Sequence, residues 1–193
     1  MIETTVNFAT TKEMSSSVLK REDFLYQPYY CEENIWHLCQ HAQFKDGYII
    51  FVASTGDSFP MLNQRVMSDP SIPILWDYHV ILLLRSETNQ ILDFDTILPF
   101  GVPVDTYFRH SFLDNRLLTA AETPLFRVVP ASEFVASFSS DRSHMKVGEG
   151  WRAPPPDWPL IGQSISNLSS FIDMTNNDVG EVLGYDALLQ RFA

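Results

Sequence analysis

Residues 74–85 contain the segment that most restricts the fold of this chain. Five consecutive apolar residues, positions 80–84, follow His79 there. An unbroken apolar run of this length is typical of a strand that is covered by protein on both faces, whereas a strand with one solvated face alternates. The segment therefore predicts a strand buried inside the fold, with other elements packed against both of its sides.

A second strand is predicted directly after this one. Residues 86–89 form a turn, and residues 90–98 carry Asp93 and Asp95 within an apolar stretch. Positions two apart share a face of a strand, so Asp77 lies on the face of His79, and Asp93 and Asp95 share a face of the next strand. An odd number of loop residues, or a bulge, places His79 and the two aspartates on one face. A two-residue turn at positions 87–88 places them on opposite faces.

The remaining elements predict an α+β fold. Apolar positions 35, 38, 39 and 42 repeat at helical spacing, so a helix is predicted over residues 31–42. One helix followed by several antiparallel strands is the order typical of α+β proteins. The other predicted elements are strands at 47–54 and 125–129, helices at 105–118, 131–138 and 185–192, and irregular chain at 55–75 and 139–160.

The length of 193 residues suits one domain with its own core. Residues 1–24 are polar and rich in Ser and Thr, and we expect them to form a loosely ordered lead-in. Residues 25–193 are then a single catalytic domain. We expect a monomer, because no part of the sequence has the heptad pattern of a coiled coil.

Charge and cysteine content exclude several classes of protein. The chain has 24 acidic and 13 basic residues, a net charge of −11, which disfavours binding to nucleic acid. No apolar run approaches the roughly 18 residues of a membrane helix, and no secretory signal is evident at the start of the chain. Cys31 and Cys39 lie too far apart on one predicted helix for a disulfide, so we expect free thiols and a reducing, intracellular compartment.

Cys31, His79 and Asp93 are the candidate catalytic residues. Each residue type alone is more often structural, since free cysteine is among the most buried residue types. Together they match a nucleophile at a helix start, a base, and an acid that orients the base. A weaker alternative is a zinc site from His37 and His41 with Glu33, although catalytic zinc needs three ordered ligands. We expect no metal and no cofactor.

Five short blocks then make the chain recognisable. They are YCEENIW at 30–36, WDYHV at 76–80, DFDTILPF at 93–100, SDRSHMK at 140–146 and WRAPPP at 151–156. In this order they resemble the protein N-terminal glutamine amidohydrolase family, over about residues 26–192. The resemblance implies a papain- or transglutaminase-like cysteine hydrolase fold. It also implies hydrolysis of the side-chain amide of an N-terminal glutamine, giving glutamate and ammonia.

The resemblance carries site residues and a cellular role. The nucleophile of the family falls on Cys31, its histidine on His79 and its acid on Asp93, with Asp95 in reserve. The resemblance implies no metal or cofactor. Its implied partners are proteins or peptides with an exposed N-terminal glutamine in the cytoplasm and nucleus. Their new N-terminal glutamate enters the arginine branch of the N-degron pathway.

An enzyme of this kind must demand a free α-amine, or it would deamidate internal glutamines. An acid that pairs with the ammonium group meets this demand, and Asp77, Glu32 and Glu33 are the candidates. We expect residues 140–156 to brace the site, with Arg142 or Arg152 bridging to a carboxylate. Two alternatives stay open. One is a cysteine protease or transglutaminase-like acyl transferase with the same triad, and the other is a non-catalytic N-terminus-binding module in which Cys31 is a core thiol.

Overall fold

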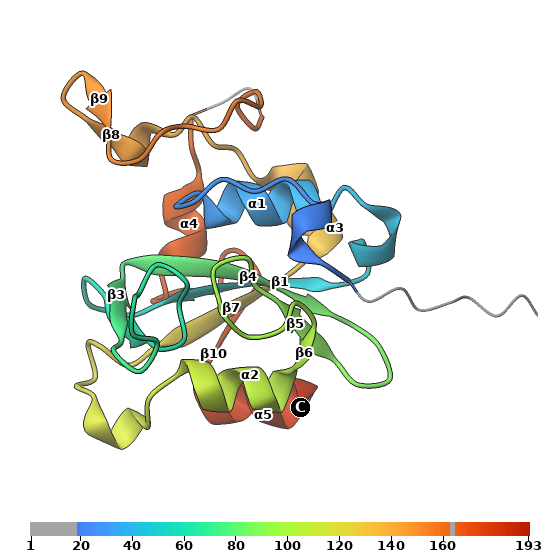
Figure 1. Cartoon of the computed structure of the whole chain (residues 1–193), viewed down its shortest axis with the longest axis vertical. Helices are drawn as coiled ribbons and strands as arrows, with labels where there is room; N and C mark the ends of the chain where they lie inside the picture. The colour runs from blue at the N-terminus through green and yellow to red at the C-terminus, as the bar shows by residue number, and fades with distance from the viewer. Residues whose placement is uncertain (1–18, 163–164) are drawn as a thin grey trace, which may run out of the picture.

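A six-stranded antiparallel sheet forms the centre of the molecule (Figure 1). The structure is a computed structural model that describes residues 19–162 and 165–193. The strand order is β10-β7-β1-β4-β5-β6. The strands of this sheet are β1 (Tyr48–Ala53), β4 (Tyr78–Leu84), β5 (Gln90–Leu92), β6 (Val102–Pro103), β7 (Leu125–Pro130) and β10 (Glu181–Leu183). The α+β prediction agrees with this mixture of helices and antiparallel strands.

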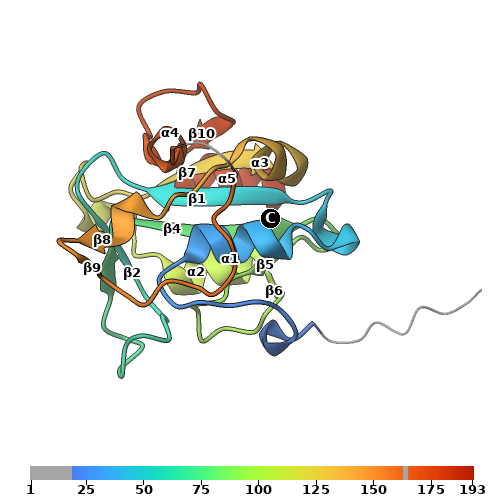
Figure 2. The same cartoon turned by 90° about the horizontal axis from the view of Figure 1, so that it is seen from above.

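Helices cover both faces of the sheet, as the two views in Figures 1 and 2 show. One face carries α1 (Cys31–Leu38), α3 (Ala131–Ser137) and α4 (Leu168–Ile172). The other face carries α2 (Val104–Ser111) and α5 (Tyr185–Phe192). Two apolar cores result, one on each side of the sheet.

Strand β4 is the buried strand predicted from the apolar run. It pairs with β1 on one side and with β5 on the other. Val80 and Leu82 belong to the core beneath α1, whereas Ile81 and Leu83 belong to the core beneath α2 and α5. Both faces of the strand are therefore dry, which explains why its sequence does not alternate.

The predicted strand 74–85 is divided into two strands. Residues Ile74–Trp76 form β3, which pairs with β2 (Phe59–Met61) in a small separate sheet, and β4 begins after Asp77. The Tyr78 N–H donates to the side chain of Asp77 at 2.9 Å, and such local bonding competes with a continuous strand. The prediction of irregular chain over 55–75 was wrong at β2, because this short strand depends on pairing with β3, 15 residues further along.

The second predicted strand, 90–98, ends early at Leu92. Asp93 accepts the N–H of Asp95 at 2.8 Å, a local turn that takes the chain out of the sheet. Five residues, 85–89, connect β4 to β5, and Leu83 pairs with Ile91. The connection therefore has the odd length that places His79 and Asp93 on one face.

Other differences lie at element ends. The helix predicted over 31–42 ends at Leu38, followed by a short 3₁₀ turn at Ala42–Phe44, and the helix predicted over 105–118 ends at Ser111. The region 139–160 contains a short hairpin of two strands, β8 (Lys146–Val147) and β9 (Gly150–Trp151). This hairpin projects from the body of the molecule in Figure 1. Helix α4 and strand β10 were not predicted, because they are short and depend on packing.

The proposed lead-in is described only in part. Residues 1–18 of it lie outside the described residues, whereas residues 19–24 contact the body of the domain. Arg21 donates to the Leu98 carbonyl at 2.9 Å, and the Phe24 ring contacts those of Phe44 and Phe100. Among the described helices, none is long and apolar enough to cross a bilayer.

Candidate active site

Cys31 is the first residue of α1, and local bonds fix where that helix begins. Asn34 in the first turn donates its side-chain amide to the Gln27 carbonyl and accepts the Gln27 N–H, at 2.9 and 2.8 Å. These two bonds pin the preceding loop against the helix start. The Cys31 side chain is thereby directed toward β4, and the residue is 8% exposed.

His79 and Asp93 form a buried pair. His79 Nε2 lies 3.0 Å from Asp93 Oδ1, and the Tyr107 hydroxyl donates to Asp93 Oδ2 at 2.7 Å. Burial lowers the pKa of His79, but the charge of Asp93 and its hydrogen bond outweigh burial, so the pKa lies above its usual value. For Asp93 burial raises the pKa, and the bonds from His79 and Tyr107 bring it below its usual value.

This pairing leaves the other imidazole nitrogen for chemistry. Because Nε2 is bonded to Asp93, Nδ1 is the atom available as a base. The Trp76 ring stacks on the imidazole with centroids 5.7 Å apart and an angle of 14° between the planes. Trp76 therefore restricts rotation of the His79 ring and covers one of its faces.

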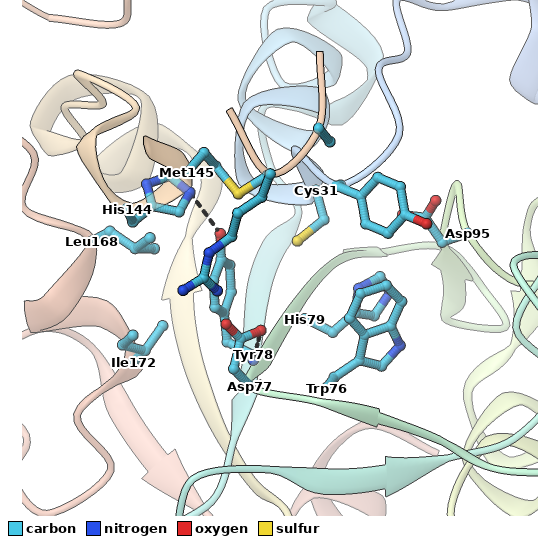
Figure 3. Close-up of a pocket in the computed structure, with 13 residues that line it drawn as sticks. Cys31, Trp76, Asp77, Tyr78, His79, Asp95, His144, Met145, Leu168 and Ile172 are labelled. Carbon is cyan, nitrogen blue, oxygen red and sulfur yellow. Dashed lines mark hydrogen bonds between the residues drawn. The ribbon is translucent and has the colours of Figure 1, made fainter. Parts of the chain in front are cut away.

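Cys31, His79 and Trp76 face one cavity of about 440 Å³ (Figure 3). Cys31, Trp76, Asp77, His79 and Asp95 line it, with apolar side chains from α4 on the far side. Within the described residues no hydrogen bond joins Cys31 Sγ to His79, although both face this cavity. Such contacts commonly shorten only when substrate is bound.

The thiol of Cys31 has an environment that differs from our expectation for a helix start. Burial, followed by the charges of Glu32 and Asp95, raises the pKa of the Cys31 thiol well above its usual value. The Val80 N–H bonds to the sulfur and opposes this shift. The helix terminus alone therefore does not produce a thiolate, because loss of hydration and two nearby acids act against it.

Glu32 belongs to a buried hydrogen-bonded network beside the cavity. Its carboxylate accepts from the Tyr78 hydroxyl at 3.0 Å and from Cys31 Sγ at 3.7 Å. The single Tyr78 hydroxyl proton points to Glu32, so the Tyr78 oxygen accepts from His144 Nε2 at 3.2 Å. His144 Nε2 also lies 3.4 Å from Glu32 Oε1, which joins the loop after α3 to the helix of the nucleophile.

Glu33 forms a second and larger network. The Arg142 guanidinium pairs with its carboxylate at 2.8 Å, and the Trp158 indole N–H and Ser140 hydroxyl also donate to it, at 2.7 and 2.9 Å. The two charged side chains are 7% and 0% exposed. Arg142 thus braces the site as predicted, whereas Arg152 lies at the cavity wall.

The predicted site residues fall into two groups. Cys31, His79, Asp77 and Asp95 all line the cavity, and Asp93 lies behind His79. Glu32 is fully buried and is not part of the cavity wall. Sequence reasoning missed Tyr107, whereas His144, which stands in the SDRSHMK block, was a weak alternative candidate for the base.

One group of side chains beside the cavity has the residue types of a metal site. In the described part of the chain, His79, Asp93 and Asp95 place one ligand atom each within 4.8 Å of one another. His79 Nε2 and Asp93 Oδ1 already bond to each other, so a cation there would have to break that pair. In the alternative zinc site of His37, His41 and Glu33, the carboxylate is already bound by Arg142. The His37 ring also packs against Trp36 and Trp158.

Comparisons with known proteins agree with the blocks found in the sequence. The model of the N-terminal glutamine amidase family matches residues 26–192. A protein N-terminal glutamine amidohydrolase from Bos taurus is 40% identical over an alignment of 165 residues that covers 80% of this chain and 79% of that protein. The Homo sapiens protein of the same name is 39% identical over 80% of each chain, and that of Danio rerio is 37% identical over 87% of this chain and 89% of that protein.

Proposed function

This chain belongs to the N-terminal glutamine amidase family, and we propose that it hydrolyses the side-chain amide of an N-terminal glutamine to glutamate and ammonia. The relatives that carry this activity in their names match it over most of their length. The observation that carries the proposal is the cavity in which Cys31 faces His79, with Asp93 bonded behind the imidazole. These three residues are the nucleophile, the base and the acid that orients the base.

The first half of the reaction forms a thioester. His79 Nδ1 takes the proton of Cys31 Sγ, and the sulfur attacks the side-chain carbonyl carbon of the glutamine. The amide nitrogen then leaves as ammonia with the proton from Nδ1. Asp93 stabilises the imidazolium during this exchange, because its pKa keeps the carboxylate ionised.

The second half releases the product. His79 Nδ1 removes a proton from water, the hydroxide attacks the thioester carbonyl, and the Cys31 sulfur departs and regains the proton. One water is consumed, and one ammonia and one glutamate side chain are formed. The oxyanion of each step needs donors, and the N–H of Cys31 at the free N-terminus of α1 is well placed to provide one.

Four further expectations belong to the same proposal. The cysteine helix packed on a sheet that bears the histidine suits a papain- or transglutaminase-like fold. We place the enzyme in the cytoplasm and nucleus as a monomer. Its product, an N-terminal glutamate, suits the arginine branch of the N-degron pathway.

Ammonia release from two peptides tests the proposal. One begins with glutamine and a free amine, and the other is the same peptide with an acetylated amine. We expect release only from the free-amine peptide, with a mass increase of about 1 Da, and none from the Cys31→Ala variant. Losing the nucleophile should remove nearly all rate beyond that of binding, since triad members act as a unit.

The other outcomes identify the alternatives. Peptide cleavage or crosslinking without ammonia release would favour the protease or acyl transferase. No reaction with either peptide, by folded protein whose Cys31 thiol is reduced, would favour the binding module. Equal release from both peptides would keep the cysteine chemistry and remove the N-terminal requirement.

A further inference from the structure

The proposed reaction requires a group that recognises the free α-ammonium of the substrate. Three acids stand close enough to Cys31 for their charges to act on its thiol: Glu32, Asp95 and Asp77. They differ in access, in bonding and in exposure. These differences separate them as candidates, and the inference drawn from them rests on the function proposed above.

Glu32 cannot meet the ammonium directly. It is fully buried and does not line the cavity. Its carboxylate already has two donors, the Tyr78 hydroxyl and the thiol of Cys31, and His144 lies beside its other oxygen. This acid therefore supports the cavity wall from behind.

Asp77 lines the cavity but is a weak candidate. Its side chain is exposed, and one carboxylate oxygen is occupied by the N–H of Tyr78 at 2.9 Å. A charge pair with water around it contributes little binding free energy, because solvent screens the charge before and after binding. Asp77 would thus attract an ammonium group without discriminating strongly for it.

Asp95 differs from Glu32 and Asp77 in access, bonding and exposure. The Tyr26 hydroxyl donates to Oδ1 at 2.5 Å, and this is the one side-chain hydrogen bond of Asp95 within the described residues. No ion pair involves Asp95 in the described part of the chain. The neighbouring Arg65 guanidinium instead donates to the Phe94 carbonyl. This half-buried carboxylate is therefore left without an ion-pair partner, and burial together with the charge of Asp93 raises its pKa although the charges of His79 and Arg65 oppose that shift.

Its position suits a group attached to the reacting glutamine. Asp95 lines the catalytic cavity and also a second hollow of about 260 Å³ beside it. One of its oxygens lies within 4.8 Å of a ring nitrogen of His79. Figure 3 shows Asp95 and Asp77 on opposite sides of His79. In a glutamine residue the α-nitrogen is four bonds, roughly 5 Å, from the carbon that Cys31 attacks.

Aromatic rings surround the same carboxylate. Tyr29 and Trp76 line both hollows together with Asp95, and their rings meet edge to face at 6.4 Å. Tyr26 adds a third ring on the side of the second hollow. An acid with aromatic faces beside it favours an ammonium group, because the ring faces attract a cation.

We propose that the Asp95 carboxylate binds the α-ammonium group of the N-terminal glutamine, with Tyr29 and Trp76 as the aromatic walls of that subsite. An acetylated or internal glutamine brings no positive charge to this position. It leaves the half-buried carboxylate without a cationic partner, and groups left without a partner in this way discriminate between substrates. Asp95 is then the residue that restricts the enzyme to chain termini.

The same charge links recognition to chemistry. Asp95 is among the acids that raise the pKa of the Cys31 thiol in the free protein. An ammonium group bound at Asp95 cancels that negative charge, which favours the thiolate. A substrate with a free amine therefore helps to activate the nucleophile that attacks it.

A substrate pair tests this assignment. The first peptide begins with glutamine, and the second carries a glutaramoyl group in its place, which keeps the amide and lacks only the α-amine. Both are measured by mass change as kcat/KM on the wild type, Asp95→Asn, Asp77→Asn and the surface control Asp46→Asn. A loss of folded protein cancels in the ratio of the two peptides for each variant.

We expect the preference for the free amine to fall about 100-fold in Asp95→Asn, the size expected when one partner of a buried charge pair is removed. Asp77→Asn and Asp46→Asn should keep the preference within a few-fold. An equal loss for both peptides in Asp95→Asn would overturn the assignment, because Asp95 would then act on the amide end. Loss of the preference in Asp77→Asn alone would move the subsite to Asp77. If the wild type converts neither peptide, the proposed function fails, and this inference fails with it.

Discussion

The Arg142 guanidinium and the Glu33 carboxylate form a buried ion pair, at 2.8 Å, between the loop over the cavity and the helix that begins with Cys31. Glu33 is two residues after the nucleophile, and Arg142 is two residues before His144, which lies at the cavity wall. Arg142 also donates to the Pro156 and Trp158 carbonyls. The Arg142 side chain therefore holds both ends of the loop over the cavity, at residue 142 and at residues 156–158, against α1.

The first prediction concerns this pair. Arg142→Ala leaves a fully buried carboxylate without its cation, and removal of one partner of such a pair costs about 3–5 kcal/mol of unfolding free energy. Urea unfolding followed by tryptophan fluorescence measures this loss. Removing Arg191, which pairs with Glu181 at the surface, should cost about 0–1 kcal/mol. Equal losses of unfolding free energy in the two variants would show that the buried pair stabilises the fold no more than the surface pair does.

The second prediction concerns the pH dependence of catalysis. Asp93 raises the pKa of His79, so Asp93→Asn should lower that pKa, and burial then favours the neutral imidazole. In both halves of the proposed reaction the neutral imidazole acts first as a base, so the acid limb of the kcat profile follows the pKa of His79. That limb should therefore move to lower pH, and kcat should fall by about 10²–10⁴-fold, because the imidazolium formed in each step loses the charge that stabilises it.

Tyr107→Phe is the matched milder variant for this prediction. It removes one hydrogen bond to Asp93 Oδ2 and leaves the charge of Asp93 in place. The acid limb should stay near its wild-type position or move slightly to higher pH, because the carboxylate keeps its charge and accepts more strongly from the imidazolium once it loses one of the bonds that keep its pKa low. An unchanged acid limb in Asp93→Asn would remove Asp93 from the triad.

The pairing of His79 with Asp93 could be anticipated because local periodicity decides which face of a strand a side chain occupies. Parity reduced the possibilities to two, and the odd connection of 85–89 in the structure is the one that places both on one face. It could not distinguish Asp93 from Asp95. That choice depends on the turn at Asp93, which takes the chain out of the sheet after Leu92 and turns Asp93 toward Tyr107.

The long-range polar networks could not be derived in the same way. With 24 acids and 13 bases, many pairings satisfy the same charges, and nothing local connects Glu33 with Arg142, 109 residues later. The break at Asp77 is a similar case, since a side chain competes there with the strand ladder. The resemblance to a family drew attention to the sequence blocks that contain Glu33, Arg142 and Asp77. Packing in the folded chain decides what each residue in those blocks contacts.

The third prediction concerns Arg127, a fully buried cation on β7 that faces α4. It donates to the Phe171 carbonyl in α4 and to carbonyls of the segment that joins α4 to β10, those of Asp173, Asn176 and Val179. Arg127→Met leaves these buried acceptors without donors, and we expect a loss of about 2–5 kcal/mol in urea unfolding. Arg127→Lys should recover only part of it, because lysine lacks the planar fork of donors. Full recovery by lysine would show that charge alone matters.

The fourth prediction concerns the reactivity of Cys31. Burial and the charge of Glu32 raise the pKa of its thiol, so iodoacetamide should alkylate the free protein slowly near neutral pH and faster as pH rises. Glu32→Gln removes the nearest negative charge, which should lower the thiol pKa and move the whole rate profile to lower pH. Cys39→Ala provides the background for both measurements, since burial raises the pKa of Cys39 to about 12 and leaves Cys31 as the reactive thiol. A rate profile that Glu32→Gln leaves in place, in protein whose fold is intact by circular dichroism, would mean that burial alone sets the thiol pKa and that the acids beside Cys31 do not restrain it.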